Sequence, residues 1–138
     1  MSSGVETNGS HRKICLLVDD DIDDHEIFSL ALEQADRPVT LIRAYDGVEA
    51  LAHLRSEDTL PDFIFLDLNM PRMNGKQCLE HLKNDEELKD IPVVIYSTSS
   101  EIKDLLDAQR LGASAFIVKS ASVQELTMAL QDFFECGE

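Results

Sequence analysis

Four short apolar runs in this 138-residue sequence each lead directly into polar residues that could do chemistry. These residues are Asp19 with Asp20, Asp67, Ser97 and Lys119. Clustered carboxylates repel one another and raise each other's pKa unless a cation lies among them. Oxygen ligands without His or Cys favour a hard ion, so we expect Mg²⁺ or Mn²⁺ if these side chains meet.

The same set of residues suits phosphoryl transfer. With a cation screening the charge of an incoming phosphoryl group, Asp67 could attack as nucleophile and form an acyl phosphate. Lys119 could then pair with one phosphoryl oxygen as a point charge, and the Ser97 hydroxyl could hydrogen-bond another. This chemistry requires that segments far apart in the sequence bring their side chains to one place.

The predicted secondary structure does so. Short apolar runs without alternation are typical of strands buried on both faces. The predicted strands cover 14–18, 39–44, 63–66, 93–96 and 115–118, and residues 39–44 alternate enough to suggest an edge strand. Helical patterns at 23–34, 48–54, 74–82, 102–109 and 122–133 separate them or follow the last strand.

Helical crossovers require parallel strands, so we predict an α/β fold. Its architecture is a three-layer sandwich around a doubly wound five-stranded parallel sheet. Ligands of such sheets bind outside the carboxyl ends of the strands, which is where the polar residues are expected.

Local signals place several helix ends. Pro71 cannot continue a strand ladder, and the Asn74-Gly75 pair is a strong turn signal in which Asn74 suits an N-cap. Gly112 is predicted to stop the fourth helix as its C′ residue. Residues 122–125 (SVQE) form a capping-box pattern that opens the last helix. The first helix is expected to bury Ile27, Leu30, Ala31 and Leu32.

The acidic composition limits the classes of partner. With 27 acidic and 12 basic residues, the net charge of −15 argues against nucleic acid and anionic membranes. No run approaches the ~18 apolar residues of a membrane span, and residues 1–10 lack a signal-peptide core. We therefore expect a cytoplasmic protein, with residues 1–11 a disordered tail and residues 12–138 a single domain.

Two other groups of residues invite simple interpretations. The cysteines are three in number and form no Cys-x-x-Cys pair, which fits a reducing compartment. His25, His53 and His81 fit no metal-ligand spacing and are predicted to be solvated helix residues.

The motifs around the polar strand ends resemble the receiver domain of bacterial response regulators. The matching stretches are LVDD (17–20), FLDLNMP-x-MNG (65–75), IYST (95–98) and FIVK (116–119). They occur in order between about Arg12 and Phe134, and imply a flavodoxin-like fold with strand order 2-1-3-4-5. LKNDEEL (82–88) and IPVV (91–94) look like single-domain regulators that serve phytochrome-type and other hybrid kinases.

The resemblance implies roles for the acidic residues. Asp67 corresponds to the phosphoacceptor. Asp20, Asp67 and the backbone carbonyl of Asn69 would bind Mg²⁺, with Asp19 helping through water.

It also implies a switch. Ser97 corresponds to the switch hydroxyl, Phe116 to the rotating aromatic residue, and Lys119 to the lysine that contacts the phosphoryl group. The family usually has Pro after this lysine, where the chain has Ser120. A cis peptide before a non-proline residue costs about 2.5–4 kcal/mol, so we predict a trans Lys119–Ser120 peptide.

The implied function is a signalling module, not an enzyme, although it would assist its own phosphorylation and dephosphorylation. It would receive phosphate from a sensor histidine kinase or a phosphotransfer protein. No DNA-binding or enzymatic domain follows Glu138, so we expect output by binding a downstream protein or by passing the phosphoryl group onward. We expect a monomer or weak dimer.

Two alternatives use related chemistry or topology. A phosphatase of the haloacid-dehalogenase type needs a second acid two residues after its nucleophile, and Asn69 stands there. A flavin-binding electron carrier needs a phosphate-cradling Ser/Thr/Gly-rich loop after the first strand, where Asp19, Asp20 and Asp21 would repel phosphate.

Overall fold

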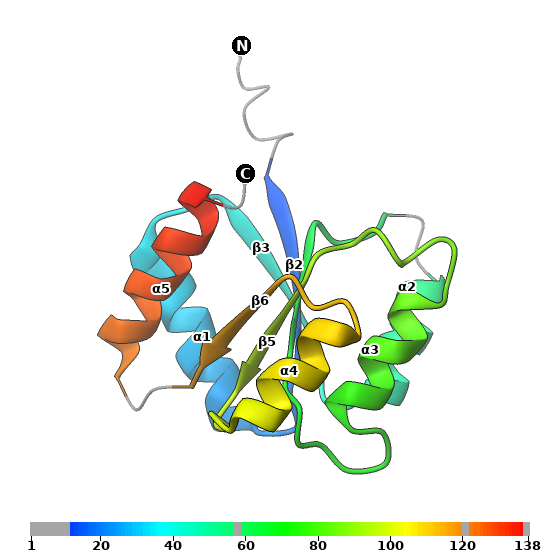
Figure 1. Cartoon of the computed structure of the whole chain (residues 1–138). Coiled ribbons are helices and arrows are strands. Elements are labelled where there is room, and N and C mark those ends of the chain that lie inside the picture. Colours follow the sequence, from blue (N-terminus) through cyan, green and yellow to red (C-terminus); the bar gives the residue numbers. More distant parts are fainter. Residues whose placement is uncertain (1–11, 57–58, 120–121, 137–138) are drawn as a thin grey trace.

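The computed structural model describes residues 12–56, 59–119 and 122–136. Strands and helices alternate along this part of the chain, as Figure 1 shows. In order they are β2 (Lys13–Val18), α1 (Ile22–Ala35), β3 (Val39–Ala44), α2 (Gly47–Ser56), β4 (Phe63–Leu66), α3 (Gly75–Lys83), β5 (Val93–Ser97), α4 (Ile102–Arg110), β6 (Ala115–Val118) and α5 (Val123–Cys136).

The strands form one sheet in which every neighbouring pair is parallel. The order across the sheet is β3-β2-β4-β5-β6, which is 2-1-3-4-5 when the described strands are counted along the chain. In the register, Leu17 pairs with Arg43 of β3 and with Phe65 of β4. The predicted order and the predicted edge position of residues 39–44 are confirmed.

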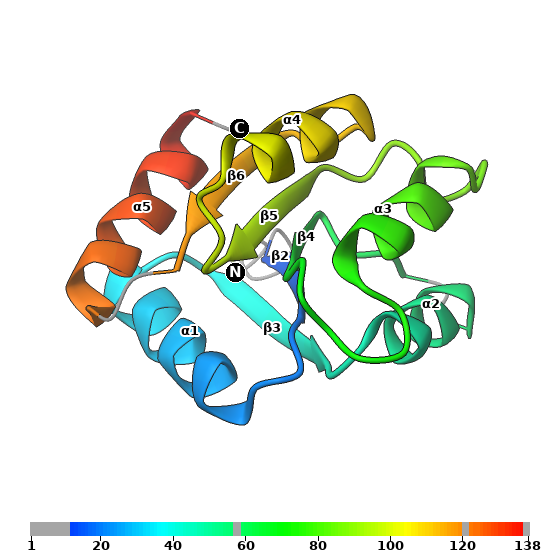
Figure 2. The same cartoon turned by 60° about the horizontal axis from the view of Figure 1, so that its bottom comes forward.

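Helices cover both faces of the sheet. Figure 2 shows α1 and α5 on one side, with α2, α3 and α4 on the other. Successive side chains of a strand point to opposite faces, so Cys15 and Leu17 pack under α1 and α5, whereas Leu16 and Val18 pack under α2 and α3. The predicted three-layer sandwich is therefore confirmed. The inner strands β2, β4 and β5 are largely buried as predicted, whereas the edge strands β3 and β6 are only partly buried.

The buried face of α1 differs from the predicted one. Phe28 is fully buried and meets Phe65 edge-on, with 5.0 Å between ring centroids, whereas Leu30 is 44% exposed. Positions 28, 31, 32 and 35 form the buried stripe, a spacing of three and four residues that keeps one face of a helix on the sheet. The expectation that Leu30 is buried was wrong, because its position lies off this face.

The predicted helix ends are observed. Asn74 accepts a bond from the Gln77 N–H at 2.9 Å, and the Gln77 side chain accepts the Asn74 N–H at 3.0 Å, so a full capping box opens α3. Gly112 follows α4 with φ of 106°, a conformation that favours glycine. The Glu125 N–H donates to Ser122 Oγ at 3.2 Å at the start of α5.

Two predictions fall outside the described residues. They concern the disordered tail over residues 1–11 and the trans peptide before Ser120, and both stay predictions. Among the helices that the structure describes, none is long and apolar enough to cross a membrane.

Candidate functional site

Backbone hydrogen bonds fix the positions of Asp19 and Asp67 at the ends of their strands. The Asp19 N–H donates to the Ala44 carbonyl and the Asp67 N–H donates to the Val18 carbonyl, both at 3.0 Å. Each bond extends a parallel ladder by one residue past the strand. The two carboxylates therefore start from adjacent, rigid points at the carboxyl edge of the sheet, and Asp67 is 5% exposed.

The next two strands position Ser97 and Lys119 in the same way. Ser97 is the last residue of β5 and is fully buried, and the Lys119 N–H donates to its carbonyl at 2.8 Å. The arrowheads of β5 and β6 point toward the lower edge of Figure 1, beside the start of α1. Ser97 Oγ accepts the Ser99 N–H at 3.4 Å.

The Lys119 ammonium lies among three carboxylates. Its Nζ is 2.7 Å from Asp24 Oδ2, 2.8 Å from Asp19 Oδ2 and 3.2 Å from Asp67 Oδ2, and the side chain is 9% exposed. Burial by itself lowers the pKa of Lys119, but the contacts with Asp19 and Asp24 and the charge of Asp67 outweigh it and raise that pKa. Lys119 therefore stays charged.

Asp19 is the most deeply buried acid at this edge. Burial raises its pKa, while Lys119 and the Asp21 N–H, which donates to Asp19 Oδ1 at 3.0 Å, act in the opposite direction. The net shift of the Asp19 pKa is upward because burial outweighs these contacts, and the charge of the nearby Asp67 adds to it. A cation among these acids would relieve that repulsion.

Three of the four predicted metal ligands form one cluster. Ligand oxygens of Asp19, Asp20 and Asp67 all lie within 4.8 Å of one another. An all-oxygen carboxylate set of this size fits a hard divalent cation. Asn69, the fourth, is exposed two residues beyond Asp67, and its N–H donates to Asp67 Oδ1 at 3.3 Å.

Phe116 lies apart from this group. It is half-buried on β6, paired with Ile95 of β5, and its ring packs against the core beneath α2, α3 and α4. With residues of α4, including Leu105 and Ala108, it lines a hollow of 230 Å³. The structure therefore places the predicted rotating aromatic residue beside α4.

Two residues near the cluster escaped the sequence analysis. Asp24, in the first turn of α1, makes the shortest of the three contacts to Lys119. His25 was predicted to be solvated, and this prediction was wrong because the side chain is fully buried. Its Nε2 lies 2.8 Å from the Asp19 carbonyl oxygen, and its ring packs on Tyr45 with 4.4 Å between centroids.

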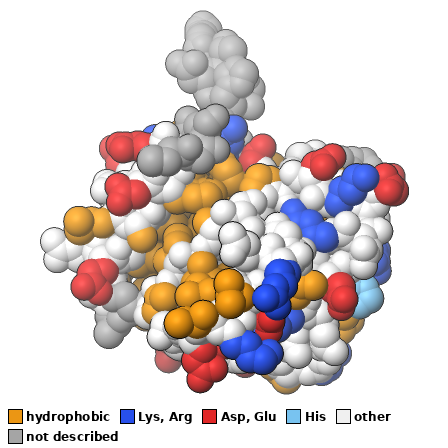
Figure 3. Space-filling view, in the orientation of Figure 1, with side chains coloured by type: hydrophobic (Ala, Val, Ile, Leu, Met, Phe, Trp, Pro, Cys, Tyr) orange, Lys and Arg blue, Asp and Glu red, His pale blue; other side chains and the backbone are white. Residues whose placement is uncertain are grey.

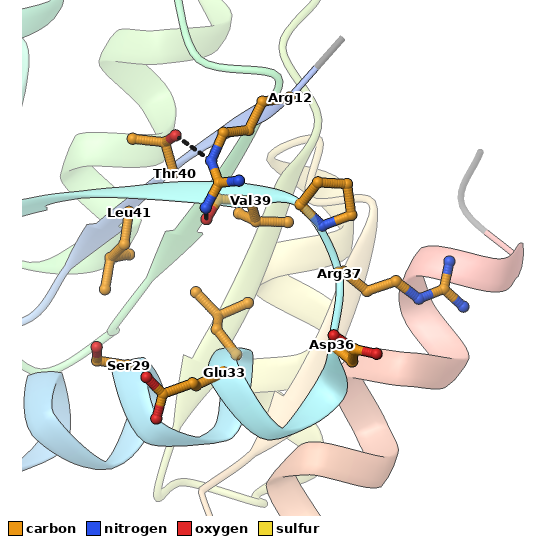
Figure 4. A pocket seen from close by; sticks show the side chains of 10 residues that line it. Arg12, Ser29, Glu33, Asp36, Arg37, Val39, Thr40 and Leu41 are labelled. Carbon is orange, nitrogen blue, oxygen red and sulfur yellow. Dashed lines mark hydrogen bonds between the residues drawn. The ribbon is translucent and has the colours of Figure 1, made fainter. Parts of the chain in front are cut away.

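A separate hollow of 660 Å³ lies where β3 begins. Figure 4 shows Arg12 beside the start of this strand, where its Nε donates to Thr40 Oγ1 at 2.9 Å. The strands are parallel, so this hollow is at the opposite end of the sheet from Asp67. It contributes no residue to the site.

Comparisons with known proteins agree with this geometry. The model of the response regulator receiver domain matches residues 15–131. Response regulator Rcp1 of Synechocystis sp. is 31% identical over 124 residues, which cover 86% of this chain and 84% of Rcp1. Chemotaxis protein CheY-3 of Vibrio cholerae is 35% identical over 92 residues, which cover 67% of this chain and 69% of that protein.

Solved structures extend the likeness to the fold. The phosphorylated cyanobacterial phytochrome response regulator RcpA superposes with a TM-score of 0.82 at 33% identity, covering 92% of this chain and 96% of RcpA. The Mn²⁺-bound form of Rcp1 superposes with a TM-score of 0.79 at 29% identity, covering 91% of this chain and 94% of Rcp1. The chain belongs to the response regulator receiver domain family.

Proposed function

We propose that this protein is a phosphorylation-switched receiver that accepts a phosphoryl group on Asp67. The observation that carries the proposal is the contact between Lys119 Nζ and Asp67 Oδ2 at 3.2 Å, at the edge of the acidic cluster. An ammonium beside a nearly buried carboxylate is placed to pair with negative charge that arrives on that carboxylate. The donor would be a histidine kinase or a phosphotransfer protein, acting in the cytoplasm.

The transfer forms one bond and breaks another. A carboxylate oxygen of Asp67 attacks phosphorus, and the bond from phosphorus to the donor's imidazole nitrogen breaks, leaving an acyl phosphate. Lys119 pairs with one phosphoryl oxygen, and the Ser97 hydroxyl donates a hydrogen bond to another. Water would later attack the phosphorus of the acyl phosphate and release inorganic phosphate and the Asp67 carboxylate. The same contacts from Lys119 and Ser97 would assist this dephosphorylation.

Asp20, Asp67 and the carbonyl of Asn69 would hold Mg²⁺ or Mn²⁺, with Asp19 contributing through water. When bound, the ion supplies positive charge that screens the phosphoryl oxygens from the acids. The Mn²⁺-bound state named for Rcp1 supports this ligand class.

A receiver of this kind is not a phosphatase with external substrates. A haloacid-dehalogenase type enzyme needs a second acid two residues after its nucleophile, and Asn69 occupies that position. The relatives named as phytochrome response regulators support a phytochrome-type kinase as the donor of the phosphoryl group.

Phosphorylation by a small donor tests the proposal without knowledge of the kinase. Incubation with acetyl phosphate and Mg²⁺ should add one phosphoryl group, detected by intact-protein mass spectrometry and removed by hydroxylamine, which cleaves acyl phosphates. Failure to label, with Mg²⁺ binding confirmed separately, would contradict the proposed function.

Mg²⁺ should stabilise the folded protein, because it binds the clustered acids of the folded state and relieves their repulsion. At tenfold its dissociation constant, the ion would add about 1.4 kcal/mol to the free energy of unfolding. The melting temperature, measured by circular dichroism, should rise by about 4–6 °C. Asp20→Ala should remove most of this rise, whereas an equal rise in that variant would exclude Asp20 as a ligand.

A hydrogen-bond path links the site to α4. Ser97 Oγ accepts the Ser99 N–H, and Ser99 Oγ donates to Asp104 of α4 at 2.5 Å. Lys76 of α3 also donates to Asp104, at 2.8 Å. If Ser97 moves toward a phosphoryl group, these contacts transmit the change to α4.

The surface beside this path can bind a partner. Figure 3 shows hydrophobic side chains gathered over the amino-terminal half of α4. Ile102 is 72% exposed and Leu106 is 43% exposed, and Val118 at the end of β6 is 47% exposed. Inward rotation of Phe116 on phosphorylation would reshape this surface, which is how we propose the signal leaves the module.

Beryllofluoride, which can stand in for the phosphoryl group on Asp67, should shift amide NMR signals between residues 109 and 126. The reason is that Ser97 would leave its contact with Ser99 and Phe116 would turn inward. Signals of β3, on the far edge of the sheet, provide the internal reference. Unchanged signals over 109–126 would exclude this switch.

A further inference from the structure

The position of Asp24 carries an inference that rests on the proposed function. The Lys119 ammonium contacts three acids, two inside the acidic cluster and one outside it. Asp19 and Asp67 belong to the cluster that fits a cation, whereas Asp24 lies outside that cluster yet makes the shortest contact, 2.7 Å. The Asp24 side chain is 22% exposed.

The start of α1 holds Asp24 in a fixed place beside the cluster. Asp21 caps the helix, and its Oδ1 accepts the Asp23 N–H at 2.8 Å. The Asp21 N–H in turn donates to Asp19 Oδ1, and His25 Nε2 contacts the Asp19 carbonyl oxygen at 2.8 Å. Asp21, before Asp24 in the chain, and His25, directly after it, therefore both contact Asp19 and fix the start of α1.

Two of the carboxylates in the acidic cluster, those of Asp19 and Asp67, also contact the Lys119 ammonium, so a divalent cation and the ammonium would compete for them. An ion held by Asp20 and Asp67, with Asp19 contributing through water, would attract the same carboxylates that now face Lys119 and would repel its positive charge. Lys119 is nearly buried, and a buried ammonium without a partner is strongly disfavoured. Asp24 supplies the remaining partner at the same distance, without a large movement of the lysine.

We propose that Asp24 is a positioning residue that holds Lys119 while a divalent cation occupies the acidic cluster. In this role it does two things. It lets the cation displace Lys119 from Asp19 and Asp67, and it keeps the ammonium close enough to Asp67 to meet an incoming phosphoryl group.

Removing Asp24 should therefore weaken cation binding through Lys119. In Asp24→Asn the ammonium has no third acid and stays on Asp19 and Asp67, so the Mg²⁺ dissociation constant should rise about tenfold. Asp23→Asn is the matched control, because Asp23 is the exposed neighbour of Asp24 and the variant removes the same charge. In Asp23→Asn the Mg²⁺ dissociation constant should rise only about twofold, because the lost charge acts on the ion from a distance and through solvent.

The Lys119→Gln variant tests whether Asp24 affects Mg²⁺ binding by holding Lys119 or only through its own negative charge. This variant should bind Mg²⁺ more tightly than the wild type, because the competing ammonium is gone. If Asp24 acts through Lys119, adding Asp24→Asn to Lys119→Gln should weaken binding no more than adding Asp23→Asn does. The comparison forms a double-mutant cycle on one pair of residues.

In the experiment, the full chain is titrated with Mg²⁺ in the absence of a phosphoryl donor, and binding is measured by calorimetry. The titration is repeated with Mn²⁺, whose binding is measured by electron paramagnetic resonance. Urea unfolding checks each variant, and Asp24→Ser is a second neutral replacement. Equal effects of Asp24→Asn and Asp23→Asn would overturn the proposal. So would an Asp24→Asn effect that persists unchanged with Lys119→Gln, or a wild type that binds no Mg²⁺. Acetyl phosphate labelling is measured in a separate experiment. A failure of the proposed phosphorylation can therefore be told apart from a failure of the proposed role of Asp24.

Discussion

Replacing Asp67 by asparagine should abolish labelling by acetyl phosphate while leaving the fold intact. An amide oxygen is a poor nucleophile. Asp19 shares the strand end, the burial and the contact with Lys119, and the family resemblance assigns the acceptor to Asp67. Asparagine has nearly the same shape and keeps an oxygen for the Asn69 N–H, which now donates to Asp67 Oδ1. Intact-protein mass spectrometry would report the labelling, and circular dichroism would report the fold.

Asp90→Asn is a suitable control for this variant. Asp90 is exposed before β5 and belongs to no cluster of possible metal ligands among the described residues. This control should be labelled at the wild-type rate. Undiminished, hydroxylamine-labile phosphate on Asp67→Asn would show that another residue is the acceptor and would remove the basis of the proposed function.

The strands were well predicted because their sequence signal is local. Residues 39–44, 63–66 and 115–118 have the same bounds in the structure as in the prediction. Each is an apolar run or near-run that ends where a polar residue or turn begins. Phe63–Leu66 is buried along its whole length, as such a run predicts, whereas the two edge strands are only partly buried. The order of the strands came from the family resemblance, because an apolar run does not specify its neighbour.

The meeting of Asp19, Asp67, Ser97 and Lys119 at one edge also followed from local signals. Once the strands are parallel, residues that follow them must gather at their carboxyl ends. In the structure Lys119 contacts both Asp19 and Asp67, and its backbone N–H bonds the carbonyl of Ser97 at the end of the neighbouring strand. The roles of these residues in phosphoryl transfer remain a proposal.

Asp24 and His25 could not be placed by the same reasoning. Both lie on α1, and their reach depends on how this helix rotates and tilts against the sheet. That orientation is set by the packing of Phe28 against Phe65 and Tyr96, contacts between segments far apart in sequence. Asp19, Asp20 and Asp21 indicated negative charge after the first strand, but no sequence signal singled out Asp24 as a partner of Lys119.

Gly75→Ala should lower the free energy of unfolding by about 3 kcal/mol or more, because overpacking here acts against rigid backbone. A Cβ at Gly75 would lie 2.2 Å from the Asp67 carbonyl oxygen and 2.6 Å from Leu68 Cα. The Gly75 N–H also donates to the Leu68 carbonyl at 2.8 Å, which holds the two segments together. Urea unfolding at fixed Mg²⁺ concentration would measure the loss.

Gly47→Ala is the matched control, since Gly47 is likewise the first residue of its helix, α2. Its Cβ would meet Met73 Sδ at 2.9 Å, and a methionine side chain can move aside. The expected loss is about 1 kcal/mol or less. Equal losses in the two variants would contradict the argument. Because the clash at Gly75 is with the backbone of Asp67 itself, Gly75→Ala should also slow acetyl phosphate labelling, whereas Gly47→Ala should not.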